Sequence, residues 1–75
     1  MTHLTLKACD EVREQMPKFE QILTGYGIRI VERWENEQAG SIELSISAYA
    51  PTFIRSVRAA AYDCFGDTLL SFNLK

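Results

Sequence analysis

The spacing of the apolar residues switches repeatedly along this chain between a helical period and a strand period. Apolar residues recur at alternating intervals of three and four from Cys9 to Leu23 and again from Phe53 to Phe65, which is typical of one buried helix face. Alternation of apolar and polar residues, typical of half-buried strands, occupies three other segments, namely residues 28–34, 42–49 and 67–75. We therefore expect one α+β domain over residues 1–75, since a chain of this length has room for a single small core.

The first segment determines the topology. Residues 3–7 alternate, so they predict a short strand and the order βαββαβ, which is the ferredoxin-like order. If these residues instead extend the first helix, with Thr2 or Thr5 as its cap, the order is αββαβ and the sheet has three strands. We favour the four-stranded order. Both orders predict a two-layer sandwich in which two helices cover one face of an antiparallel sheet.

Glycine and proline mark the ends of the predicted elements. Gly25 or Gly27 is suited to end the first helix, and Gly66 to end the second. Pro17 lies inside the first helical pattern, where it removes one backbone hydrogen bond. We expect a kink there, with Pro17 on the convex, solvent side; the alternative is a break, with Pro17 as the first residue of a second helix.

A hairpin is predicted in the middle of the chain, with its turn near Gln38. This turn sets the expected cross-strand pairs, which are Trp34 with Ile42, Ile30 with Ile46, and Arg33 with Glu43. Trp34 is then expected on the core side of the sheet. In the last strand, the alternation predicts Leu70, Phe72 and Leu74 on the core side.

Charge and hydropathy exclude several partners. The net charge is -2 and the pI is about 5.2, whereas proteins that bind duplexes by neutralising phosphates carry a basic excess. The predicted outer face of the hairpin carries a single aromatic residue, Tyr49, so it does not predict a base-stacking surface either. The sequence contains no apolar run of the roughly 18 residues that span a bilayer, and its first residues lack the pattern of a signal peptide. We expect a cytoplasmic protein that binds neither nucleic acid nor membrane.

The residues that carry chemistry are few. One histidine and two cysteines, far apart in the sequence, do not make a metal-binding motif. We expect Cys9 and Cys64 to be reduced core thiols and His3 to be a solvated terminal residue. No nucleophile, base and orienting group are predicted to meet. The sequence therefore predicts neither a catalytic site nor a cofactor, and we expect a protein that is not an enzyme.

Two groups of residues are candidates for binding another protein. Arg55, Arg58 and Tyr62 form a stripe on the outer side of the second predicted helix, and arginine and tyrosine are enriched at protein interfaces. Trp34 at the hairpin is the other candidate. We predict a protein–protein interaction module, a small inhibitor or regulator of a larger complex, of the kind that phages and bacteria encode. The alternative is a regulatory domain that binds a small molecule as a homodimer.

Overall fold

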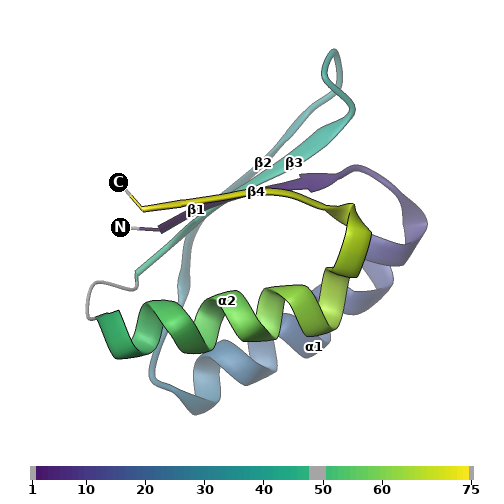
Figure 1. The fold of residues 1–75 in the computed structure, drawn as a ribbon. Coiled ribbons are helices and arrows are strands. Elements are labelled where there is room, and N and C mark those ends of the chain that lie inside the picture. Colours follow the sequence, from purple (N-terminus) through teal and green to yellow (C-terminus); the bar gives the residue numbers. More distant parts are fainter. Residues whose placement is uncertain (1, 48–50, 75) are drawn as a thin grey trace.

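The structure is a computed structural model that describes residues 2–47 and 51–74 (Figure 1). In chain order its elements are β1 (Thr2–Lys7), α1 (Asp10–Gly25), β2 (Ile30–Asn36), β3 (Ser41–Ile46), α2 (Pro51–Phe65), the 3-10 turn η1 (Gly66–Thr68) and β4 (Leu69–Leu74). The predicted order βαββαβ is confirmed, and the three-stranded alternative is wrong.

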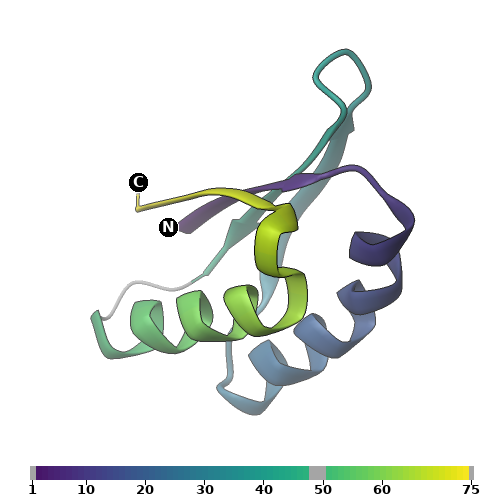
Figure 2. The same cartoon turned by 45° about the vertical axis from the view of Figure 1, so that its right-hand side comes forward.

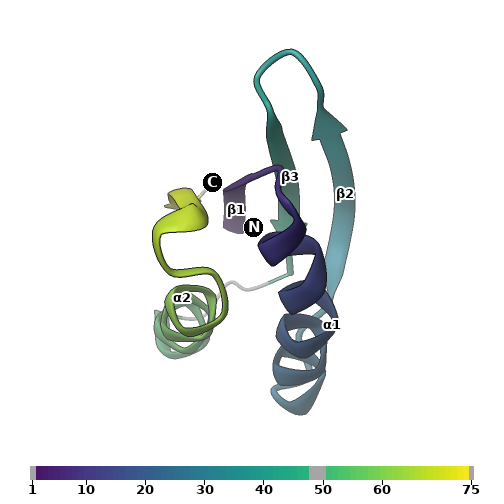
Figure 3. The same cartoon turned by 90° about the vertical axis from the view of Figure 1, so that its right-hand side faces the viewer.

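The described strands form one antiparallel sheet in the order β2-β3-β1-β4. Both helices lie on the same side of it, α2 beneath the β1 and β4 side and α1 beneath the β3 and β2 side (Figure 3). The protein therefore has two layers, with an inner sheet face that packs on the helices and an outer face on the opposite side. β1 is a central strand although it contributes only two large apolar side chains, Leu4 and Leu6, both completely buried.

The core lies between the sheet and the helices. It combines the inner side chains of β1 and β3 with the apolar stripes of α1 and α2. Phe19 of α1 and Phe65 of α2 meet edge to face, with ring centroids 5.0 Å apart. The helical and strand periods read from the sequence thus place most of the same residues inside, and Val57 and Ile46 are completely buried as that pattern predicts. Phe53, predicted on the buried face of the second helix, is instead 43% exposed, because it lies in the first turn of α2 at the end of the core.

Helix α1 continues through Pro17 without a break, and Pro17 is exposed on its solvent side. The last turn ends at Gly25, after which the Ile28 amide donates to the carbonyl of Leu23. Gly27 has a φ of +72°, a left-handed conformation that glycine adopts without steric cost. This reversal directs the chain from α1 into β2.

The predicted register of the hairpin is correct at its base and wrong beyond it. Ile30 faces Ile46 as expected, but an irregularity at Val31 adds one residue to β2. Since neighbouring residues of a strand point to opposite faces, one extra residue transfers every later side chain to the other face. Trp34 therefore lies opposite Glu43 on the outer face, and Arg33 lies opposite Leu44.

A second irregularity moves Leu70 out of the core. Leu6 faces Leu69 and Thr5 faces Ser71, so Leu70 is the extra residue in β4. Its side chain is 57% exposed, whereas the sequence pattern placed it inside. Phe72, opposite Leu4, is on the inner side as predicted.

The β2–β3 hairpin extends well past the helical layer (Figure 2). For this reason every residue of β2 after Ile30 is exposed. Among the described residues, no helix is both long and apolar enough to cross a bilayer.

Candidate functional site

The outer face of the sheet is the first candidate site, because no described element covers it. Its side chains form two rows that cross all four strands. The first row is Ser71, Thr5, Glu43 and Trp34, and the second is Asn73, His3, Ser45 and Glu32. Every residue of these rows is polar except Trp34, so this face is a hydrophilic surface with one large aromatic side chain.

Glu43 is the centre of a hydrogen-bond cluster on this face. Its Oε1 accepts from Thr5 Oγ1 at 2.9 Å and lies 3.0 Å from His3 Nε2, and its Oε2 accepts from Ser41 Oγ at 2.9 Å. The side chains of His3 and Glu43 are only 14% and 16% exposed. The expectation of a solvated terminal histidine is therefore wrong, because the pairing of β1 with β3 places His3 over the middle of the sheet.

The carboxyl of Glu43 is held in its charged form. Partial burial raises the pKa of Glu43, but the hydrogen bonds from His3, Ser41 and Thr5 and the electrostatic attraction of His3 lower it by more. The pKa of Glu43 is therefore below its ordinary value, since donors that favour the carboxylate outweigh desolvation.

Trp34 stands beside this cluster. Its indole ring lies 5.5 Å from the imidazole of His3, at a tilted angle of 44°. Hydrogen bonding to Glu43 holds His3, and this fixed imidazole supports one side of the indole. The rest of Trp34 is open, with 43% of the residue exposed. The contact with His3 restricts the orientation of the Trp34 side chain. Because the side chain is already ordered, it loses less conformational entropy when a partner covers it.

Both hydroxyls of the cluster bond to the same carboxylate. Thr5 Oγ1 donates to Glu43 Oε1 and Ser41 Oγ donates to Glu43 Oε2, each at 2.9 Å. Among the described residues, no three His, Cys, Asp or Glu side chains are grouped closely enough to hold a metal ion.

The hairpin that carries Trp34 is acidic. Residues 32–43 contain four glutamates, at positions 32, 35, 37 and 43, and one arginine, Arg33. Arg13 of α1 contacts Glu35 at 3.5 Å on the inner side of the hairpin. The side chains of Glu32 and Glu37 form no hydrogen bond or ion pair with any other described residue. With four glutamates and one arginine, residues 32–43 carry a formal net charge of -3.

The predicted stripe on α2 is present, but it lies on a different side of the molecule from Trp34. Arg55 and Arg58 are exposed, and Tyr62 is 57% exposed. The guanidinium carbon of Arg58 is 5.1 Å from the centre of the Phe72 ring, a cation–π contact between α2 and β4. The sequence-predicted residues thus divide into two separate surfaces, one on the outer sheet face and one beside β4.

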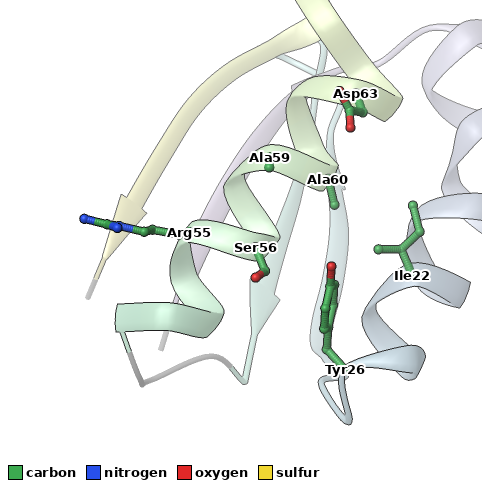
Figure 4. Close-up of a pocket in the computed structure, with 7 residues that line it drawn as sticks. All are labelled: Ile22, Tyr26, Arg55, Ser56, Ala59, Ala60 and Asp63. Carbon is green, nitrogen blue, oxygen red and sulfur yellow. The ribbon is translucent and has the colours of Figure 1, made fainter.

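A groove between the C-terminal end of α1 and one side of α2 is a third candidate (Figure 4). Its volume is about 450 Å³, and its lining residues are Ile22, Tyr26, Arg55, Ser56, Ala59, Ala60 and Asp63. Tyr26 stands between the two helices, while the Arg55 side chain extends away from the groove on the opposite side of α2. No pattern in the sequence indicates this groove, since it arises only where the two helices meet.

The two cysteines are free thiols. Cys64 is buried in the core, and this burial raises the pKa of its thiol. Cys9, just before α1, is half-buried against the core.

The fold and this site define a two-layer α+β protein with a polar, uncovered sheet face and one exposed tryptophan. Comparison of the chain with protein-family models, with curated proteins and with solved structures finds no match. Sequence reasoning missed His3, Thr5 and Glu43 as a cluster. The polar residues that alternate with leucine in β1 and with apolar residues in β3 could have indicated this cluster. When the two strands pair, these polar residues lie on the same face of the sheet.

Proposed function

We propose that this protein is a protein-binding module that attaches to a basic surface of a larger protein and thereby inhibits or regulates it. The observation that carries the proposal is Trp34, held against His3 on the uncovered sheet face of a hairpin in which acidic residues outnumber basic ones. Tryptophan is among the residues that dominate binding energies at protein interfaces.

The charge around Trp34 favours a cationic partner group. The face of an indole attracts an arginine or lysine side chain, and such a contact contributes about 0.5 to 2 kcal/mol. Glu32 and Glu37 have no partner among the described residues, so both are available to pair with further basic side chains. Proteins that bind nucleic acids present basic surfaces of this kind. We therefore propose such a protein as the class of partner.

The first test uses the intrinsic fluorescence of Trp34, which is the only tryptophan in the sequence. We expect a short oligo-arginine peptide to change its emission saturably at low salt, and the change to disappear at about 1 M salt, where charges are screened within about 3 Å. An oligo-glutamate peptide is the control. No change with oligo-arginine, or an equal change with both peptides, contradicts the proposal.

The second test identifies the partner. Tagged wild-type protein and the variants Trp34→Ala and Tyr26→Ala are used to capture proteins from lysate. Tyr26 is the matched control because it is an aromatic residue of similar exposure, 46%, outside the sheet face. We expect a protein with a basic surface to be retained by wild type and by Tyr26→Ala, and lost with Trp34→Ala. Equal capture by all three proteins refutes the role of Trp34.

The groove between α1 and α2 favours a second candidate, a regulatory domain that binds a small molecule. Ser56 and Asp63 would supply its polar contacts and Tyr26 its aromatic wall. A panel of metabolites screened by thermal shift tests this function. A compound that raises the melting temperature of wild type but not of Tyr26→Ala would favour the groove over the sheet face.

A further inference from the structure

The two edges of the sheet differ in how they are protected. Natural proteins place charged side chains on edge strands to prevent pairing with other chains. The β2 edge carries Glu32, Arg33 and Glu35. β4 has no charged residue between Leu69 and Leu74, and β1 is its only neighbour among the described strands. The irregularity at Leu70 bends this edge locally, but without a charged side chain the backbone groups on the other side of β4 remain available to another strand.

Helix α2 borders this edge with exposed side chains. Figure 3 shows α2 beneath the β1 side of the sheet, and β4 is the strand next to β1 at this edge. The cation–π contact of Arg58 with Phe72 joins α2 to β4. Arg55 and Tyr62 are exposed on the same side of α2 as Arg58. If another strand paired with β4, the elements next to that strand would therefore contact Arg55, Arg58 and Tyr62.

Charge varies along the edge from one end to the other. α2 and β4 run in opposite directions, so the first turns of α2 lie beneath the C-terminal end of β4 (Figure 1). Arg55 is at this end. Asp67, in η1, is exposed at the other end, where β4 begins. The same edge thus has a basic end and an acidic end.

We propose that the occupant of this edge is a second copy of the chain, with the two β4 strands paired antiparallel about a two-fold axis near Ser71. Antiparallel pairing places the basic end of each copy beside the acidic end of the other. A two-fold interface requires a surface that is complementary to itself in this way, whereas a strand from an unrelated protein does not. The product is one continuous sheet with all helices on the same side.

The contact of Arg58 with Phe72 shows which residues of α2 lie beneath which residues of β4. A step of two residues along α2 covers about 3 Å, and so does a step of one residue along β4. An axis at Ser71 therefore passes near the middle of both elements. It places Arg58 near the partner's Tyr62 and Arg55 toward the partner's Asp67.

This dimer leaves the outer face free. Trp34 lies on β2, the strand at the opposite edge from β4, so pairing through β4 does not cover it. The dimer and the proposed partner binding are independent, and either can fail without the other.

Analytical ultracentrifugation over a range of concentrations tests the dimer. We expect the mass of wild type to approach twice the 8.5 kDa of one chain. The two-fold axis creates the contact between Arg55 and the partner's Asp67 twice. Arg55→Glu or Asp67→Arg puts like charges at both contacts, and we expect each variant to raise the dissociation constant about tenfold. The double variant restores opposite charges, so its dissociation constant is expected to return to within about threefold of wild type. Leu70→Lys introduces a charge into the edge and is expected to weaken the dimer as well.

Controls on the other edge separate this interface from a general effect of charge. Arg33→Glu and Glu32→Arg make the same changes in net charge on β2, and we expect wild-type association from both. Circular dichroism checks that every variant is folded, since all five positions are exposed. A wild-type protein that remains at the mass of one chain at about millimolar concentration overturns the proposal. Equal weakening by Arg55→Glu and Arg33→Glu, or a double variant weaker than both single variants, also overturns it.

Discussion

Replacement of Glu43 is expected to destabilise the protein because three side chains lose a shared acceptor. Thr5, Ser41 and His3 all bond to its carboxylate, at distances of 2.9 to 3.0 Å. A hydrogen bond contributes a net of about 1 kcal/mol, and more when one group is charged. Because water reaches this face and replaces part of what is lost, we expect Glu43→Ala to lower the free energy of unfolding by about 2 kcal/mol. A domain of this size has a total of only about 4 to 11 kcal/mol.

Urea denaturation followed by Trp34 fluorescence measures this loss. With a slope of about 1 to 2 kcal/mol/M for a small domain, the midpoint of unfolding is expected to fall by about 1 to 2 M. Glu43→Gln retains an oxygen that accepts from Thr5 and His3, and the Ser41 hydroxyl can rotate to accept from the amide. We therefore expect this variant to lose about 1 kcal/mol or less. Glu37→Ala, in the exposed turn of the hairpin, is the control. If Glu43→Ala lowers the midpoint no more than Glu37→Ala does, the cluster does not stabilise the fold.

The same carboxyl predicts a dependence on pH. The pKa of Glu43 in the folded protein is lower than its ordinary value of 4.5, so the unfolded chain binds the proton more readily. Its contribution to stability is therefore fully present above the unfolded pKa and is lost as the pH falls through the folded pKa. We expect the difference in unfolding free energy between wild type and Glu43→Gln to shrink from about pH 6 to about pH 3. A difference that stays constant or grows on acidification refutes this reasoning.

Three further predictions concern the core, a turn and the thiols. Phe19→Ala removes a completely buried ring that packs on the second helix, and we expect a loss of about 3 to 5 kcal/mol in urea denaturation. Gly27→Ala forces a side chain into a left-handed conformation with open space around it, so thermal unfolding is expected to show a loss of about 1 to 2 kcal/mol. Gly25→Ala, at a glycine without this conformation, is expected to be neutral or slightly stabilising; equal effects would contradict the assignment. Iodoacetamide is expected to alkylate half-buried Cys9 first and buried Cys64 only on unfolding, because burial raises the pKa of the Cys64 thiol and blocks access to it. Mass spectrometry of the labelled peptides checks this order.

The apolar periods of the sequence predicted the element order, the two layers and most of the core. Each of these properties follows from local spacing. Residues of α1 at intervals of three and four must share one side of a helix, and alternating residues of β3 must share one side of a strand. Burial of those sides against each other then leaves only a few arrangements of the layers. For the same reason Val57 and Ile46 could be assigned to the core from the sequence.

The candidate site depended on contacts that local spacing does not encode. A single extra residue near Val31 turned Trp34 from the core to the outer face, and a second one exposed Leu70. An irregularity of this kind is set by how two strands fit together, because neither strand alone shows which residue is extra. His3 and Glu43 are 40 residues apart in the chain, and only the pairing of β1 with β3 brings them into contact. The helices, strands and their apolar sides could thus be predicted from neighbouring residues, whereas the cluster beside Trp34 and the uncharged edge at β4 exist only in the assembled sheet.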